Sequence, residues 1–184
     1  MNSSDTTASG KTIDFTNGAV DQRTLRDAFA RFPTGVTIIT ARAEDGKCEG
    51  ITANSFSTVS LDPPLVLWNL RRDARSRLGF TSASHFTIHI LSRDQHRIAK
   101  HFATPVVDKF EGLSVEYGLG GCPLLPDYLA RFECKTKDII PVGDHFVWIG
   151  EVVRARYNDA EPLIFSGGRF AALAELDKWM CWPL

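Results

Sequence analysis

The stretch Ile51-Thr-Ala-Asn-Ser-Phe-Ser-Thr-Val-Ser-Leu-Asp-Pro-Pro-Leu65 differs in composition from the rest of the chain. Six neutral hydrogen-bonding side chains stand in it beside apolar ones, with no charge before Asp62: Thr52, Asn54, Ser55, Ser57, Thr58 and Ser60. Ser and Asn are poor strand residues, so a purely structural strand would gain from Val or Ile. A planar heterocycle with carbonyl and imide edges needs such a lining of neutral donors and acceptors. The stretch therefore indicates either a ligand site or an exposed strand face.

Extended segments lie on both sides of this stretch. Val36–Thr40 is a β-branched run that leads into a turn around Asp45-Gly46, which predicts a hairpin with the run entering Ile51-Thr52. Pro63-Pro64, near the end of the stretch, suits a sheet edge or a loop, because proline has no N–H to donate. Further strands are predicted over residues 65–68, 129–136, 145–157 and 162–165.

One further strand contains two histidines. Phe86, Ile88 and Ile90 alternate with polar residues, which predicts a strand with one buried face and half-exposed His85 and His89.

Helical patterns are fewer. Asp21 can cap a helix whose apolar residues recur at helical spacing, and these are expected to form one buried stripe of Leu25, Ala28, Phe29 and Phe32. Ser92 and Gln95 match a capping box that opens a second helix, and residues 73–80 suit a short third one. Strands outnumber helices about two to one, so we expect a mainly β protein with a few helices, built as an antiparallel barrel.

Length and charge restrict the class of protein. The 184 residues suit one domain over 19–174, with a flexible tail at 1–18 and a C-terminal tail at 175–184 that packs on the domain or on a second subunit. The formal net charge of −1 gives no basis for a nucleic-acid partner, although the basic stretch of residues 71–77 is enough for one small anionic ligand. The sequence shows no membrane span or targeting segment, and its four cysteines form no CxxC pair. These features predict a cytoplasmic protein with free thiols.

Several kinds of chemistry are not supported by the sequence. The glycines at 118, 120 and 121 have the wrong spacing for a Rossmann dinucleotide site, and the chain has no P-loop motif. His85 and His89 lie in a predicted strand without an HExxH pattern, so we expect no metal site. Ser166-Gly167-Gly168 is more typical of a turn than of a nucleophile elbow.

An ordered set of motifs resembles the flavin reductase-like, FMN-binding split-barrel family, which includes the short-chain reductase components of two-component monooxygenases. The set runs from about Leu25 to Leu173 and comprises Phe32-Pro-Thr-Gly-Val36, the run Gly50–Leu65, Trp68-Asn69 with Arg75-Ser76, Asp94-Gln95, Phe102-Ala103, Asp108-Lys-Phe110, Leu129 to Glu133-Cys134, Gly143-Asp-His145 with Gly150-Glu-Val152, and Pro162-Leu163 through Gly167-Gly-Arg169-Phe170. The resemblance implies an antiparallel split β-barrel and a homodimer. This sequence departs from the family pattern at Phe170, where the family often has Tyr.

By this resemblance the protein is an NAD(P)H:flavin oxidoreductase. It would transfer a hydride from NADH or NADPH to FMN or FAD and supply reduced flavin to a partner monooxygenase. The resemblance assigns the isoalloxazine to Thr52, Ala53, Asn54 and Ser55, and the ribityl chain and phosphate to Asn69, Ser76 and Arg77. It also places Thr34, Gly35 and Phe110 near the flavin, and His145 beside the nicotinamide.

Each assignment has a structural alternative. Arg77 can be a solvated helix residue, and Gly143-Asp144-His145 can be a tight turn into the next strand. Two other functions also stay open. One is an enzyme that holds FMN tightly and reduces another acceptor; the other is a non-catalytic flavin-binding module.

Overall fold

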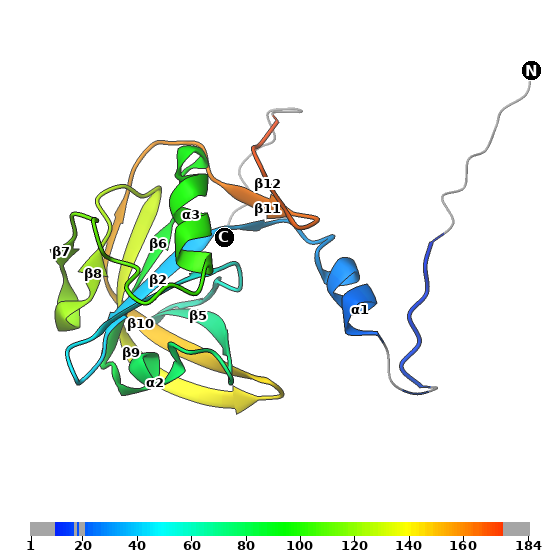
Figure 1. Cartoon of the computed structure of the whole chain (residues 1–184), viewed down its shortest axis with the longest axis horizontal. Coiled ribbons are helices and arrows are strands. Elements are labelled where there is room, and N and C mark those ends of the chain that lie inside the picture. The colour runs from blue at the N-terminus through cyan, green and yellow to red at the C-terminus, as the bar shows by residue number, and fades with distance from the viewer. Residues whose placement is uncertain (1–9, 17, 19–20, 175–184) are drawn as a thin grey trace, which may run out of the picture.

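A seven-stranded antiparallel sheet forms the body of the protein (Figure 1). The computed structural model describes residues 10–16, 18 and 21–174. The order across the sheet is β3-β2-β6-β9-β10-β5-β4. Its strands are β2 (Thr37–Arg42), β3 (Cys48–Ala53), β4 (Ser57–Leu61), β5 (Pro64–Arg71), β6 (His85–Ile90), β9 (Ala130–Val142) and β10 (His145–Tyr157).

Two small sheets and a few short helices complete the described chain. One small sheet joins β1 (Thr34–Gly35), β11 (Ile164–Ser166) and β12 (Arg169–Ala171), and the other pairs β7 (Glu116–Tyr117) with β8 (Pro123–Leu124). The helices are α1 (Gln22–Phe29), α2 (Arg77–Ser82) and α3 (His96–Ala103), with 3₁₀ turns η1 (Arg93–Gln95) and η2 (Leu119–Gly121). The prediction of a mainly β protein with a few helices is confirmed.

The two faces of β2 contribute to two apolar clusters, because successive strand residues point to opposite faces. Ile39 and Ala41 enter a cluster centred on Trp68 and Trp148, whose rings stack 4.7 Å apart. Ile38, together with Val36 just before β2, enters a second cluster under α3 with Phe102, Leu125 and others. Strand β2 therefore joins the α3 side of the sheet to the aromatic core.

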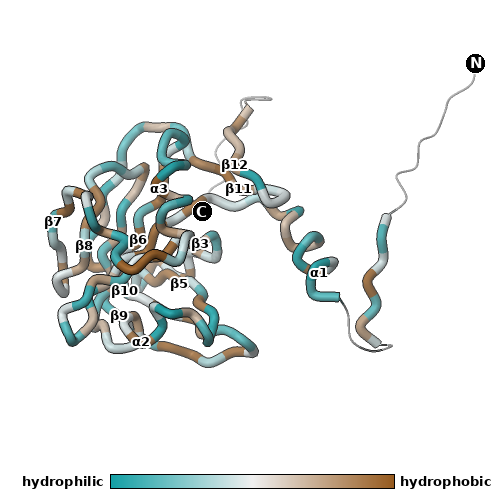
Figure 2. Tube along the Cα trace, viewed as in Figure 1, coloured by the Kyte–Doolittle hydropathy of each residue, from teal (hydrophilic) through white to brown (hydrophobic). Residues whose placement is uncertain are grey.

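Helix α1 forms as predicted, but its apolar stripe is not buried. Asp21 caps the helix by accepting hydrogen bonds from the N–H groups of Arg23 and Thr24. No residue of α1 is buried, and Phe29 and the following Phe32 are 68% and 77% exposed. The expectation of a buried stripe is wrong within this single chain because α1 extends away from the sheet (Figure 1). Apolar and polar residues occur together along this exposed helix in Figure 2.

Strand β6 is covered on both faces, so the expectation of a half-exposed His89 is also wrong. His89 is fully buried between β2 and the segment that contains β8. Its Nδ1–H donates to the Ile38 carbonyl at 3.2 Å, and its Nε2 accepts the Leu125 N–H at 3.1 Å. The alternation in the sequence marked the strand correctly, but a segment distant in sequence covers its polar face.

The helix α3 lies against β3, and a glycine permits their close approach. The capping box of Ser92 and Gln95 is present at η1, which leads directly into α3. A Cβ at Gly50 would lie 2.7 Å from Phe102 Cδ1 and 3.0 Å from Phe110 Cζ, so only glycine fits there without a shift. This contact places the C-terminal end of α3 against the middle of β3.

The described part of the chain contains no helix long and apolar enough to cross a membrane. Within the same residues no group of three or more His, Cys, Asp or Glu side chains is arranged to hold a metal ion. The predicted C-terminal tail lies outside the described residues, as does most of the predicted N-terminal tail.

Candidate functional site

A cavity of about 470 Å³ lies where the ends of four elements meet. The end of β3 and the residues after it, the end of β5, the start of β10 and the C-terminal end of α3 form its walls. The register of β10 on β5 pairs His145 with Arg71 and Val147 with Asn69, which brings these two strand ends to one place. The lining includes six residues predicted from the sequence, namely Thr52, Ala53, Asn54, Ser55, Asn69 and His145. We call this space the ring cavity.

Two hydroxyls of the ring cavity, those of Thr52 and Ser55, hold its walls together. Ser55 Oγ accepts the backbone N–H of Asn69 at 2.9 Å and donates to the Asn69 carbonyl at 3.3 Å. Thr52 Oγ1 donates to the carbonyl of Ala99 in α3 at 2.6 Å. Both hydroxyls therefore donate their protons within the protein. They fix the wall of the ring cavity and offer no free donor to a ligand.

Asn69, in the lining of the ring cavity, carries a buried acceptor, Oδ1, without a hydrogen-bond partner among the described residues. An unpaired buried polar atom costs free energy, and the cost falls when a bound molecule supplies the donor. The imide N–H of a planar heterocycle is a suitable donor.

His145 stands at the rim of the ring cavity with one nitrogen fixed. Its Nδ1 lies 2.7 Å from the Asp144 carboxylate, and this hydrogen bond lowers the pKa of Asp144. Because a carboxylate only accepts, Nδ1 carries the proton, and in the neutral ring Nε2 is an acceptor. The turn that presents this pair is held to the β5–α2 loop by a hydrogen bond from the Arg72 N–H to the Asp144 carbonyl at 3.0 Å.

A second cavity of about 710 Å³ adjoins the first. The two share Ile51, Arg71, Ala74, Ala103 and Lys109 in their linings. Four cationic side chains and two carboxylates line this outer cavity: Lys47, Arg71, Arg75, Lys109, Glu49 and Asp73. The excess of positive charge suits a phosphate or pyrophosphate group. The buried Ser76 also lines the outer cavity, as its assignment to a phosphate requires.

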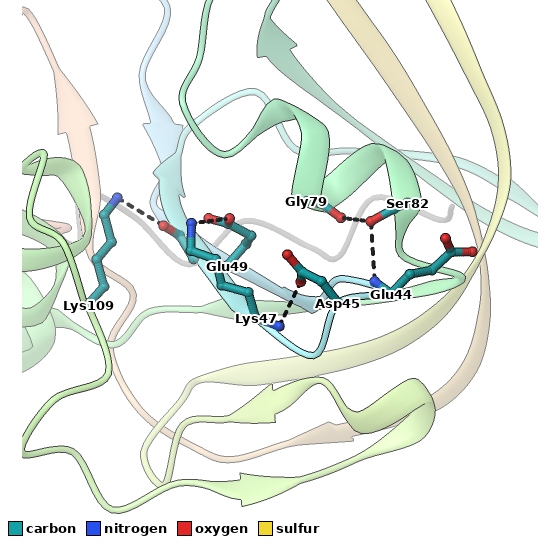
Figure 3. A network of polar contacts seen from close by, with 8 residues as sticks. Glu44, Asp45, Lys47, Glu49, Gly79, Ser82 and Lys109 are labelled. Carbon is teal, nitrogen blue, oxygen red and sulfur yellow. Dashed lines mark hydrogen bonds and ion pairs between the residues drawn. The ribbon is translucent and has the colours of Figure 1, made fainter.

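Lys109 occupies the wall between the two cavities. Its Nζ donates to the carbonyl of Gly50 at 2.9 Å and to that of Phe102 at 2.6 Å. Burial lowers the pKa of this half-buried ammonium, against the opposing charge of Glu49. Figure 3 shows Lys109 reaching the strand that carries Glu49, whose carboxylate binds Lys47 Nζ at 2.9 Å.

A third cavity, of about 220 Å³, lies on the other side of the Thr52–Asn54 segment. It is lined mainly by apolar side chains, among them Val36, Phe165 and Phe170. Thr34 and Gly35 pair with β11 beside this cavity, and Thr34 Oγ1 is buried without a partner among the described residues. Neither residue lines any of the three cavities.

Two other predicted residues lie away from the cavity walls. Arg77 begins α2 but lines none of the three cavities, and Phe110 packs on Phe102 with ring centroids 5.3 Å apart. The sequence reasoning missed Arg71, Arg75 and Lys109. Arg71 and Arg75 belong to the basic stretch noted above, and Lys109 belongs to the Asp108-Lys-Phe110 motif. Those two signals could have identified them.

The model of the flavin reductase like domain family matches residues 29–174. The chain belongs to this family. The resemblance noted in the sequence is therefore confirmed. A curated relative of this flavin reductase family, the FMN reductase (NADH) SmoA of Agrobacterium fabrum, is 44% identical over 156 residues, which cover 85% of this chain and 88% of the relative. The reductase component of the 4-nitrophenol 4-monooxygenase/4-nitrocatechol 2-monooxygenase of Rhodococcus opacus is 36% identical, over 82% of this chain and 80% of that protein.

A solved structure of this flavin reductase family gives the same result for the fold. The NADH:FAD oxidoreductase SgcE6 of Streptomyces globisporus C-1027, in complex with NAD and FAD fragments, matches with a TM-score of 0.80 and 38% identity. The match covers 86% of this chain and 96% of that one. The residues present here fit a flavin, because the ring cavity holds an unpartnered buried acceptor and the outer cavity carries an excess of cations.

Proposed function

We propose that this protein is an NADH-dependent flavin reductase that reduces FMN or FAD and supplies the reduced flavin to a partner monooxygenase. The observation that carries the proposal is the junction of a neutral, polar ring cavity with a cationic outer cavity. This pair of spaces matches a molecule with a planar heterocycle at one end and a phosphate-bearing tail at the other. The relatives named above have this activity or serve such a monooxygenase.

The protein's part in the reaction is to hold two rings in position, since the flavin and the nicotinamide supply the redox chemistry. Asn69 Oδ1 would accept a hydrogen bond from the flavin's imide edge, and the exposed cations of the outer cavity would hold the phosphate. At the rim, Asp144 fixes the tautomer of His145, so that Nε2 would be free to accept a hydrogen bond from the nicotinamide carboxamide. This division of roles requires no acid–base pair.

Two structural features belong to the same proposal. The first is closure of the sheet as a split barrel. The hydrogen bonds of Ser55 to Asn69 support it, because they join the chain after the edge strand β3 to β5, next to the opposite edge. The second is a homodimer, supported by the uncovered apolar residues of α1, which a second copy would bury. A cytoplasmic location belongs to the same proposal. The free thiols of Cys48, Cys122 and Cys134 support it, because thiols stay reduced in that compartment.

A steady-state assay that crosses NADH and NADPH with FMN and FAD tests the activity. We expect NADH oxidation only when a flavin is present, and a colourless purified protein that binds flavin reversibly. NADH oxidation without flavin, or no oxidation with either flavin, would overturn the proposal. A yellow protein that keeps its FMN through purification would instead favour a prosthetic flavin and another acceptor.

A further inference from the structure

The wall between the ring cavity and the outer cavity carries a cation that no carboxylate of the described residues binds directly. Lys109 and Arg71 both line the two cavities. Arg71 is exposed, and its guanidinium forms an ion pair with Asp73 at 2.6 Å. Lys109 is half-buried, and its two hydrogen bonds go to backbone carbonyls. Glu49 lies near Lys109, but its carboxylate binds Lys47 (Figure 3).

An ammonium group has three N–H donors, and two of those on Lys109 are used by Gly50 and Phe102. One donor and most of the positive charge are therefore available to a molecule that spans the two cavities. Because the group is half-buried, its charge is less screened than that of the exposed Arg71.

The chemistry of the flavin identifies which atoms lie at such a junction. The ribityl tail leaves the ring at N10, and N1 and the C2 carbonyl are next to N10. The wall at which a tail leaves the ring cavity is thus the wall closest to N1. Hydride transfer breaks the C4–H bond of NADH and forms N5–H, so the flavin gains two electrons and one proton. The product carries one additional negative charge, which gathers at N1 and the C2 carbonyl. Positive charge near this edge stabilises that product.

We infer that Lys109 is the residue that stabilises the anionic reduced flavin, through its ammonium at the junction of the ring and outer cavities. This inference rests on the proposed function, since it takes a flavin as the molecule that spans the cavities. It assigns different tasks to two cations of the same wall. Lys109 acts on the charge that forms during reduction. The charge of Arg71 is already offset by Asp73, so we expect that pair to have no preference between the two redox states.

The test measures binding of oxidised and chemically reduced flavin under anaerobic conditions at mildly alkaline pH. The variants are Lys109→Met, Lys109→Arg and, as a matched control on the same wall, Arg71→Met. We expect Lys109→Met to weaken binding of reduced flavin about tenfold more than binding of oxidised flavin. The midpoint potential of the bound flavin then falls by about 30 mV, since a tenfold ratio in a two-electron couple corresponds to that shift. Lys109→Arg restores most of the ratio. Arg71→Met should weaken binding of oxidised and reduced FMN alike, because Arg71 lines the cationic outer cavity, and it should therefore leave the ratio unchanged.

Riboflavin and FMN as parallel probes separate the ring from the phosphate. We expect the Lys109→Met effect to be equal for both flavins, because it acts at the ring. An effect seen with FMN alone would make Lys109 a phosphate ligand and overturn the inference. Equal weakening of oxidised and reduced flavin would do the same, since a merely structural lysine gives no redox preference. The reduced flavin is made without NADH, so a failure here is separate from failure of the reductase activity.

Discussion

The hydroxyl of Ser55 and the backbone of Asn69 exchange two hydrogen bonds, with N–H to Oγ at 2.9 Å and Oγ–H to the carbonyl at 3.3 Å. One small side chain therefore replaces the strand pairing that is missing between the end of β3 and β5. We expect Ser55→Ala to lower the free energy of unfolding by about 1–3 kcal/mol, because it leaves the Asn69 N–H unpaired in a half-buried place. Flavin affinity should fall as the wall of the ring cavity loosens.

Urea unfolding and flavin fluorescence titration check this prediction. Ser57→Ala is the matched control, because Ser57 is exposed and bonds only to the carbonyl of its neighbour Thr58. Equal stability of the two variants would show that the hydrogen bonds between Ser55 and Asn69 contribute nothing to the free energy of unfolding.

His145 should affect turnover more than flavin binding. We expect His145→Ala to lower NADH oxidation about tenfold, equivalent to ~1.4 kcal/mol in the barrier. The flavin dissociation constant should change less than twofold, since Nε2 faces the nicotinamide in our proposal. Stopped-flow reduction of bound flavin measures the first quantity and a fluorescence titration the second. His145→Gln keeps a hydrogen-bond acceptor and should recover part of the rate. A loss of flavin affinity as large as the loss of rate would contradict the assignment.

His89 should make the fold sensitive to acid. Burial lowers the pKa of His89 from 6.5 to about 3, since no charge is accommodated at its site between β2 and β8. The unfolded chain takes up the proton as the pH falls below 6.5, whereas the folded protein takes it up only near pH 3. Stability is therefore full above pH 6.5 and declines as the pH falls toward 3. The slope should approach 1.4 kcal/mol per pH unit, as an order of magnitude.

Thermal unfolding across this pH range tests the His89 prediction. His89→Gln should be less stable at neutral pH but show a flatter pH dependence. The exposed His96 gives the control, because His96→Gln should keep the slope of the unaltered protein. Identical slopes for all three proteins would assign the acid sensitivity to other groups.

Gly50→Ala should disturb both stability and the site. The added methyl would overlap the buried Phe102 ring, so α3 or β3 has to move. We expect a loss of about 1–3 kcal/mol and weaker flavin binding, since both elements line the ring cavity. Gly35→Ala is the control for stability, because a Cβ there meets nothing within 4 Å. A Gly50→Ala protein as stable as the control would show that the two elements are free to separate.

The apolar face of α1 should be a dimer contact. We expect Phe29→Asp to shift the protein from dimer to monomer in light scattering coupled to size exclusion, because a charge would be buried in the interface. Leu78 in α2 is exposed to a similar degree, at 67%, and Leu78→Asp should leave the dimer intact. A monomeric unaltered protein, or a dimer that tolerates Phe29→Asp, would contradict this proposal.

The elements that sequence reasoning predicted well have strong local signals. The strand β10 has the predicted bounds, since a Gly-Asp turn precedes it. The first half of the neutral stretch, Thr52–Ser55, lines the ring cavity, whereas Ser57, Thr58 and Ser60 lie in the largely exposed edge strand β4. The errors concern what covers each element. Nothing local in the sequence shows that a distant segment buries His89, or that α1 stands clear of the sheet.

Lys109 shows the same limit within the site. It lies in a loop without apolar periodicity, and its position depends on the carbonyl of Gly50, 59 residues away in the chain. A motif match could mark the residue, but only the tertiary contact places its ammonium between two cavities.

The size of the outer cavity bears on how the protein chooses among its flavins. A space of about 710 Å³ beyond the ring cavity does not exclude a long nucleotide tail. Discrimination between FMN and FAD must therefore come from attractive contacts rather than from steric rejection. A preference of that kind is graded, so the ratio of the two reduced products should follow the relative concentrations of FMN and FAD in the cell. An oxygenase served by this reductase then has to impose its own selection on the flavin it receives.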